Sequence, residues 1–315
     1  MTELRENRKD VLVLDAGDLL FKKFSNPAPE NELKMVSDKA DLIIESFNLM
    51  GYDALGIGDD DLSLGKEFLI GISKKAKFPF LSSNVMDEES GKLLFQPYLL
   101  KGINGMRVGI FSLLSPDVFL SPTDIRKKGL IIRNPIETAQ SMIKELQPKT
   151  DLLILLSHLS YPKDVELAQT VSGIHFIIGS HTGANLVYPP LIKSTYILET
   201  APKGMYVGRL ELNFFNHSFS FYNSTEKRSL ESKLNYVKHR LMAKETPEHE
   251  RAQWQKAKED TEKALSLLQG KNELTNIIFP LRTEMKDHPE IKRWSRNINL
   301  NIRKRENPLL QNKPR

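Results

Sequence analysis

Acidic or imidazole residues follow four of the short apolar runs in the chain. Asp18 comes directly after VLVLD-AG, and three adjacent carboxylates at 59–61 follow YDALGIG. His158 follows DLLILLS, and His181 follows HFIIGS. In α/β proteins, ligands bind beyond the carboxyl ends of the strands, because loops converge there without disturbing the core. We therefore expect these four loops to meet at one point.

Each position also has a purely structural explanation. Asp18 could cap the turn that follows it, since Asp after Gly is common in turns. The carboxylates at 59–61 could form a solvated acidic turn, although adjacent carboxylates repel one another and a bound cation relieves that repulsion. His158 and His181, each taken alone, could be structural. We expect two further histidines to be structural, namely His175 within a strand and His217 in a hairpin turn.

Short apolar runs alternate with amphipathic stretches up to about residue 224, and these elements must position the four loops. The alternation predicts an α/β domain with helices packed on sheets. Asn104-Gly105 favours the positive φ values of a two-residue hairpin turn. We expect strands at 11–15, 79–85, 98–103, 107–113, 151–157 and 176–178, helices at 31–50, 135–146 and 163–171, and a closing antiparallel pair at 206–215 and 218–222.

Helical spacing replaces this alternation after residue 224. Apolar residues form one stripe over 230–241 and a second over 254–268, and Thr246-Pro247-Glu248 is a good helix start. We therefore divide the chain into an α/β domain at 1–224, a helical hairpin at 225–280, and a polar basic tail at 281–315 that we expect to be partly disordered over 303–315.

Composition excludes several classes of protein. With 40% hydrophobic and 27% charged residues among 315, the chain is neither collagen-like nor wholly disordered. It has no apolar run of about 18 residues, which predicts no membrane span. Cysteine is absent, which removes disulfides and thiolate ligands. The net charge of +5 comes from the region after residue 224, where interleaved acids and few aromatics argue against a nucleic-acid partner.

Seven segments carry a resemblance to a known family. They are LDAGD at 14–18, NLMGYDALGIGDDDLSLG at 48–65, FPFLSSNV at 78–85, NGMRVGIFSLLSP at 104–116, DLLILLSHLS at 151–160, GIHFIIGSHTG at 173–183 and KGMYVGRLEL at 203–212. In this order they resemble the 5'-nucleotidase and UDP-sugar hydrolase branch of the calcineurin-like metallophosphoesterases. The resemblance implies a four-layer α/β/β/α sandwich, here followed by the C-terminal helical hairpin, in which two metal ions share a carboxylate and activate water for attack on phosphorus.

The resemblance also implies a role for each strand-end residue. Asp18 falls at the shared carboxylate, Asp59 at an Asn ligand, and His158 and His181 at two histidine ligands. Asp60 falls where the family has a catalytic histidine, and a carboxylate would act there as a general acid only with its pKa raised above about 3.9. Asp60 and His158 are therefore the candidate catalytic residues, and the substrate-binding residues stay unknown.

Departures from the family bear on the metal content. The first metal's Asp-x-His strand is lacking, and Gly183 stands where its last ligand is normally His or Gln. Four candidate ligands of the other metal remain, at 18, 59, 158 and 181. We therefore expect one divalent ion, Mn, Zn or Fe, rather than two.

Two functions are compatible with this pattern. The first is a divergent metal-dependent phosphoesterase of the 5'-nucleotidase type that hydrolyses a phosphate ester or anhydride, such as a nucleotide. The alternative is a non-catalytic binding or scaffold protein of the same fold, whose helices at 225–270 dock a protein partner or a second copy. A truncated reading of a longer gene is a third explanation. Family members are mostly periplasmic or extracellular, whereas the chain as written predicts the cytoplasm.

Overall fold

The computed structural model describes residues 10–21, 30–202, 204–243 and 247–306. It divides the chain into two compact units. One unit comprises the described residues of 1–205 and 281–315, and the other comprises those of 206–280. Within the described residues, no helix is long and apolar enough to cross a membrane.

The first sheet of the larger unit is parallel and lies under two helices. Its order is β1 (Leu14–Asp15), β2 (Ala54–Gly56) and β3 (Phe80–Leu81). Helices α2 (Glu30–Met50) and α3 (Lys66–Ser73) bury their apolar faces against it, in a core that includes Ile44, Leu55 and Leu69. The predicted helix at 31–50 is therefore confirmed, whereas the first predicted strand is shorter than expected.

The second sheet is larger and mixed. Strands β11 (Thr195–Leu198), β9 (Phe176–Gly179), β8 (Leu152–His158) and β6 (Met106–Leu114) are parallel, with β10 (Leu191–Ile192) and β5 (Tyr98–Ile103) antiparallel at the edges. Asn104 and Gly105 have φ values of 49° and 80°, which confirms the predicted β5–β6 hairpin. Helices α4 (Pro135–Leu146) and α5 (Tyr161–Thr170) pack on this sheet.

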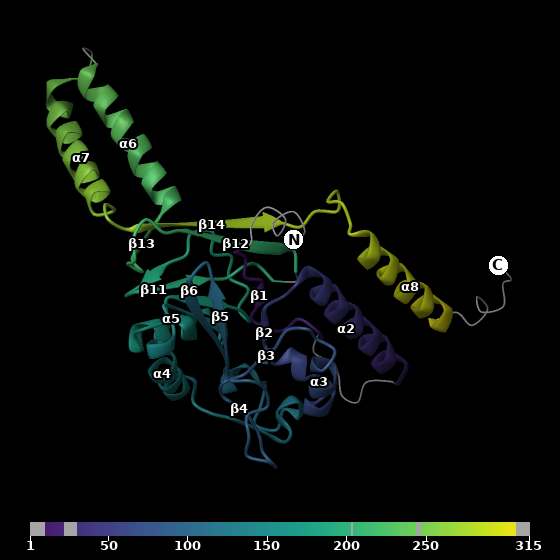
Figure 1. The fold of residues 1–315 in the computed structure, drawn as a ribbon. Helices are drawn as coiled ribbons and strands as arrows, with labels where there is room; N and C mark the ends of the chain where they lie inside the picture. Colours follow the sequence, from purple (N-terminus) through teal and green to yellow (C-terminus); the bar gives the residue numbers. More distant parts are fainter. Residues whose placement is uncertain (1–9, 22–29, 203, 244–246, 307–315) are drawn as a thin grey trace. The chain divides into compact units, whose positions relative to one another are not determined.

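The two sheets pack face to face, with a glycine at one point of close approach between them. A Cβ on Gly56 of β2 would lie 2.6 Å from the Oγ of Ser112 on β6 and 3.1 Å from the Cβ of Leu156 on β8. The layers therefore run helix, sheet, sheet, helix, and Figure 1 shows α2 and α3 on the opposite side from α4 and α5. This arrangement confirms the predicted four-layer α/β/β/α sandwich. A separate small sheet pairs β4 (Val85–Asp87) with β7 (Leu130–Ile132).

The smaller unit corrects the predicted pairing of its strands. Strand β12 (Tyr206–Asn213) pairs with β14 (Asn272–Pro280) and not with β13 (Phe221–Asn223). Because β14 also pairs with β13 in parallel, the chain needs a crossover between these two strands. Helices α6 (Ser224–Met242) and α7 (Glu248–Ser266) provide it, so a strand ends the range that we expected to be a helical hairpin.

The helices of the smaller unit pack on each other. Val237 of α6 and Thr261 of α7 are buried, and Tyr236 meets Trp254 edge to face at a centroid distance of 5.8 Å. Arg240 also forms an ion pair with Glu250 at 3.1 Å. The apolar stripes predicted from the sequence thus contact each other within the chain.

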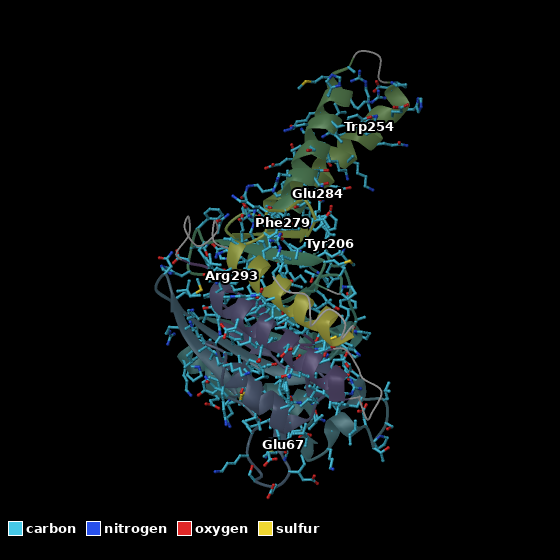
Figure 2. The ribbon with its side chains drawn as sticks, turned by 90° about the vertical axis from the view of Figure 1, so that its right-hand side faces the viewer. Glu67, Tyr206, Trp254, Phe279, Glu284 and Arg293 are labelled. Atoms are coloured by element: carbon cyan, nitrogen blue, oxygen red, sulfur yellow. The ribbon has the colours of Figure 1, made fainter. Side chains whose placement is uncertain are left out.

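The end of the larger unit contains a further helix. Helix α8 (Pro289–Glu306) lies beside α2 in both views (Figures 1 and 2). The range 281–315, expected to be a polar and partly disordered tail, therefore includes 18 helical residues. The expected disorder at 303–315 falls partly on this helix and partly on 307–315, which lie outside the described residues.

Candidate metal centre

Four loops and strand ends from both sheets converge beyond the carboxyl ends of the strands. Asp18 follows β1, Asp59 follows β2, His158 ends β8 and His181 follows β9. One oxygen or nitrogen atom from each of these four residues lies within 4.8 Å of the corresponding atom of every other. The structure therefore brings together the four residues predicted from the sequence as metal ligands.

His158 lies at the centre of this group. Its Nε2 is 3.1 Å from Oδ1 of Asp59 and 3.3 Å from Oδ2 of Asp18, and Nδ1 of His181 is 3.4 Å from Oδ1 of Asp59. The other ring nitrogen of His158 donates to the carbonyl of Ala16 at 3.0 Å, since a carbonyl can only accept. Such a bond orients the ring and directs Nε2 toward a metal, as in many histidine sites.

Opposite charges hold the group together. Burial disfavours a charged His158, but hydrogen bonds to Asp18 and Asp59 raise its pKa to about 10. Burial likewise disfavours a charged Asp59, but hydrogen bonds with His158 and His181 and the charges of His158 and Arg126 hold its pKa well below the ordinary range. The two carboxylates and two imidazoles form a donor set that suits a divalent transition metal, whose charge would compensate the carboxylates in the same way.

Asp61 fixes the backbone of the loops that carry Asp18 and Asp59. Its side chain is 1% exposed and accepts hydrogen bonds from the backbone N–H groups of Asp18, Leu19, Leu20 and Gly58 at 2.9 to 3.0 Å. Burial, followed by the charge of Asp18, raises the pKa of Asp61 to about 7, while the backbone bonds act in the opposite direction. The sequence indicated three adjacent carboxylates but not that the third one ties the first two loops together.

Close backbone packing and unusual dihedral angles accompany this convergence. A Cβ on Gly58 would lie 2.6 Å from Cε1 of His158, so only glycine fits there. Asp18 and His181 have φ values of 60° and 74°, which residues with a side chain seldom adopt. Strained backbone of this kind persists where surrounding contacts enforce it, and it is concentrated at functional sites.

Asp60 lies beside the four donor atoms and is not one of them. Its backbone N–H donates to Oδ1 of Asp18 at 2.9 Å, and its Oδ1 accepts from Nη1 of Arg126 at 2.8 Å. Asp60 is thus oriented toward a cationic side chain, and its backbone fixes the Asp18 carboxylate.

Arg126 is the main residue that sequence reasoning missed. It is 5% exposed, and its guanidinium donates to Asp59, Asp60 and Asp124, with both Nη2 and Nε directed at Asp124. It lies in a short 3-10 helix (Ile125–Lys127), in a stretch with no helical or strand periodicity. Asp124-x-Arg126 is a weak local signal, and nothing in it indicates contact with residues 59 and 60.

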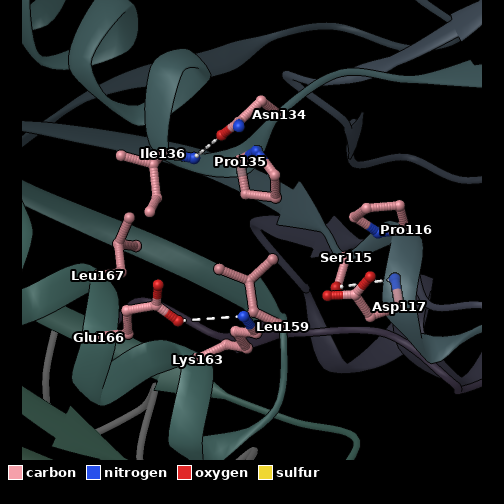
Figure 3. Close-up of a pocket in the computed structure, with 10 residues that line it drawn as sticks. All are labelled: Ser115, Pro116, Asp117, Asn134, Pro135, Ile136, Leu159, Lys163, Glu166 and Leu167. Atoms are coloured by element: carbon pink, nitrogen blue, oxygen red, sulfur yellow. Dashed lines mark hydrogen bonds and ion pairs between the residues drawn. The ribbon is translucent and has the colours of Figure 1, made fainter.

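A pocket of about 380 Å³ is lined in part by Leu159, the residue after His158, but by none of the four candidate ligands (Figure 3). Lys163 and Glu166 form an ion pair at 3.1 Å, and Ser115 and Asn134 each accept a backbone N–H. These polar groups are therefore already paired with protein. The pocket is lined by Ser115, Pro116, Asp117, Asn134, Pro135, Ile136, Leu159, Lys163, Glu166 and Leu167.

Comparison with known sequences gives relatives of one kind, although no protein-family profile matches the chain. A 5'-nucleotidase of Vibrio cholerae is 29% identical over 237 residues, which are 65% of this chain and 41% of that protein. The trifunctional nucleotide phosphoesterase protein YfkN of Bacillus subtilis is 28% identical over 260 residues, which are 68% of this chain and 17% of that protein. The chain thus spans less than half the length of these relatives.

Comparison with solved structures finds relatives of the same kind as the sequence comparison. The 5'-nucleotidase precursor from Thermus thermophilus matches 68% of this chain and 44% of its own, with 29% identity and a TM-score of 0.55. The calcineurin-like phosphoesterase YfkN from Bacillus subtilis matches 96% of this chain and 88% of its own in fold, with 18% identity and a TM-score of 0.62. The fold is that of the calcineurin-like phosphoesterases. Within that class the sequence resembles the 5'-nucleotidases, which confirms the resemblance found from the seven segments.

Replacing Asp61 by alanine should destabilise the protein more than replacing a surface aspartate. The backbone N–H groups that donate to Asp61 would lose a buried partner. We therefore expect Asp61→Ala to lower the free energy of unfolding, measured by urea denaturation, by about 2 to 4 kcal/mol. Asp41→Ala, which removes a surface ion pair with Lys75, is the control and should cost less than about 1 kcal/mol. Equal losses for the two variants would contradict the role of Asp61.

Removing the Arg126 guanidinium should cost far more than removing a surface guanidinium. Arg126→Met leaves three carboxylates without their cation, and breaking buried ion pairs in this way costs about 3 to 5 kcal/mol. Arg107→Met breaks the exposed ion pair with Asp151 and an exposed hydrogen bond to the carbonyl of Pro148, and should cost less than about 1 kcal/mol. Urea denaturation of both variants at pH 7 measures the difference, and a small loss for Arg126→Met would show that its pairs are not compensating buried charge.

Proposed function

We propose that the chain is a divergent metal-dependent phosphoesterase of the 5'-nucleotidase type. The convergence of two carboxylates and two imidazoles beyond the strand ends carries this proposal. The relatives named 5'-nucleotidase and nucleotide phosphoesterase support a phosphate ester or anhydride, such as a nucleotide, as the substrate. A divalent cation at this centre would polarise a phosphoryl oxygen and lower the pKa of a water molecule.

The four donor residues have the proposed role of ligands to one Mn, Zn or Fe ion. Asp18 and Asp59 each have one oxygen fixed by protein, through Asp60 N–H and Arg126, and direct the other toward the histidines. Gly183 has no side-chain ligand atom, and a Cβ at this position would lie 2.8 Å from Cδ of Pro202. This position therefore supports one bound ion rather than two.

Asp60 has the proposed role of an acceptor beside the ion. Because Arg126 donates to its carboxylate, the contact favours the ionised form over a general acid. An ionised carboxylate here can orient an attacking water or a substrate hydroxyl by accepting its proton in a hydrogen bond. Arg126 places a positive charge next to this acceptor, where an anionic substrate would gain from it.

One observation favours the non-catalytic alternative. The Arg126 guanidinium already compensates Asp59 and Asp60, which are a candidate ligand and a candidate catalytic residue. A binding protein of this fold could keep such a pair permanently and bind neither metal nor phosphate. Metal analysis of the purified protein separates the enzyme from a metal-free binding protein, since the enzyme requires about one transition-metal ion per chain. A binding protein that keeps a metal is separated from the enzyme by the hydrolysis assay.

The hydrolysis assay tests the enzymatic proposal directly. We expect the protein to hydrolyse an aryl phosphate and a nucleoside monophosphate with Mn²⁺, Co²⁺ or Zn²⁺ added, and His181→Ala to lose at least about 100-fold of that rate because a ligand is removed. His217→Ala, which changes an exposed histidine of the smaller unit, should leave the rate unchanged. Activity that survives His181→Ala would show that the reaction occurs elsewhere.

A further inference from the structure

Two buried acids lie behind the candidate ligands. Asp164 of α5 is 0% exposed, and Glu199, directly after β11, is 3% exposed. Within the described residues, Oδ2 of Asp164 and Oε2 of Glu199 have no hydrogen-bond partner. A buried polar atom without a partner costs free energy and calls for an explanation.

The two unpartnered oxygens border the same small space. They lie 2.7 Å (Asp164) and 3.4 Å (Glu199) from the point where a Cβ on Gly179 would stand. Since glycine has no Cβ, both carboxyl groups fit beside the end of strand β9. A larger residue at this position would separate them.

The other oxygens of the pair hold the segments that carry the two histidines. Oδ1 of Asp164 accepts from the hydroxyl of Ser157, which precedes His158. Oε1 of Glu199 accepts from the backbone N–H of Ala184 at 2.9 Å, three residues after His181. The backbone of Gly183, in the same segment, also forms a hydrogen bond with Glu199. Each acid is therefore fixed to one histidine-bearing segment, while Oδ2 of Asp164 and Oε2 of Glu199 still have no partner.

A single proton on one of the two unpartnered oxygens would allow a hydrogen bond between the two acids. Two ionised carboxylates buried side by side repel each other and have lost their hydration, whereas one proton makes each oxygen part of a hydrogen bond. Burial raises the pKa of both groups, and the charge of Glu199 raises that of Asp164 further. Hydrogen bonds from Ser157 to Asp164 and from the backbone of Ala184 and Gly183 to Glu199 oppose this rise. The charges of His158, which acts on both acids, and of His181, which acts on Glu199, oppose it as well.

We propose that Asp164 and Glu199 share one proton between Oδ2 and Oε2, and that this hydrogen bond positions His158 and His181 relative to each other. The positioning role rests on the proposed function, because it assumes that the two histidines bind a metal. The sharing of the proton does not depend on any metal.

The pH dependence of unfolding tests the shared proton. The folded pair keeps its proton to a higher pH than the unfolded chain does, so wild-type stability should fall as pH rises from about 5 toward the raised pKa of the pair. In Glu199→Gln the amide N–H donates to Asp164 without a proton being needed. The ratio of the wild-type to the variant unfolding constant should therefore grow with pH, by up to about tenfold per pH unit.

Controls and a second variant keep this test decisive. Asp164→Asn should behave like Glu199→Gln, and the exposed Glu88→Gln should give a ratio that does not change with pH. If neither buried variant folds, the infrared carbonyl stretch of a protonated carboxyl group should still be visible in the wild-type protein at pH 8, where the Asp61 carboxyl group, with its pKa of about 7, is mostly ionised. A pH-independent ratio, or the absence of that band, would overturn the shared proton. Stabilisation by Na⁺ or Ca²⁺ at constant ionic strength, lost in Glu199→Gln, would overturn it in favour of a bound cation.

Calorimetric titration with Mn²⁺ tests the positioning role. We expect Glu199→Ala to weaken Mn²⁺ binding by 10- to 100-fold and Glu199→Gln to keep it within a few-fold of the wild type, because only the amide preserves the link. Unchanged affinity in Glu199→Ala would overturn the positioning role. If His158→Ala and His181→Ala also bind Mn²⁺ as the wild type does, the metal centre itself is wrong, while the pH test of the shared proton still stands.

Discussion

Charge compensation of buried carboxylates is the constraint on which the region beyond the strand ends depends. Asp59 is buried and meets two imidazoles and a guanidinium, and Asp61 is buried and meets backbone N–H groups from two loops. Removing either set of partners would leave a charge in a medium that solvates it poorly, at a cost of several kcal/mol. Asp18 and His181 keep strained dihedral angles because the free energy of these contacts offsets the cost of the strain.

The sequence predicted the convergence of the four donors because strand ends obey a simple geometric rule. An apolar run marks a buried strand, and the polar residue that follows a parallel strand lies at the same edge as its neighbours. No such rule covers Arg126, because the stretch at 116–130 lacks periodicity and its contacts join residues about 66 positions apart in the chain. Glu199 was missed for a similar reason, since a single acid after a short strand indicates nothing until Asp164 is seen beside it.

The smaller unit shows where reasoning from neighbours in the sequence fails. Two strand-like segments separated by a few residues predict a hairpin, yet β12 forms its eight-residue ladder with β14, far along the chain. The three-residue β13 is too short to match β12, and pairing it with β14 in parallel makes the helices α6 and α7 a crossover connection. The apolar run in β14 was obscured because it directly follows a long stretch of helical spacing.

The geometry of Arg126 connects the two proposed functions. Its Nε and Nη2 are held by Asp124, so the guanidinium stays in place even if the contacts of Nη1 change. Nη1 donates to Asp59 and Asp60, and a phosphate bound beside these carboxylates would compete with them for the same donor. Since planar guanidinium groups bind phosphate oxygens well, an anchored arginine with one shared donor is suited to such an exchange. In an enzyme, a bound cation would compensate the charge of Asp59 when Nη1 of Arg126 donates to phosphate instead. In a non-catalytic protein, Arg126 would keep its ion pairs with Asp59 and Asp60.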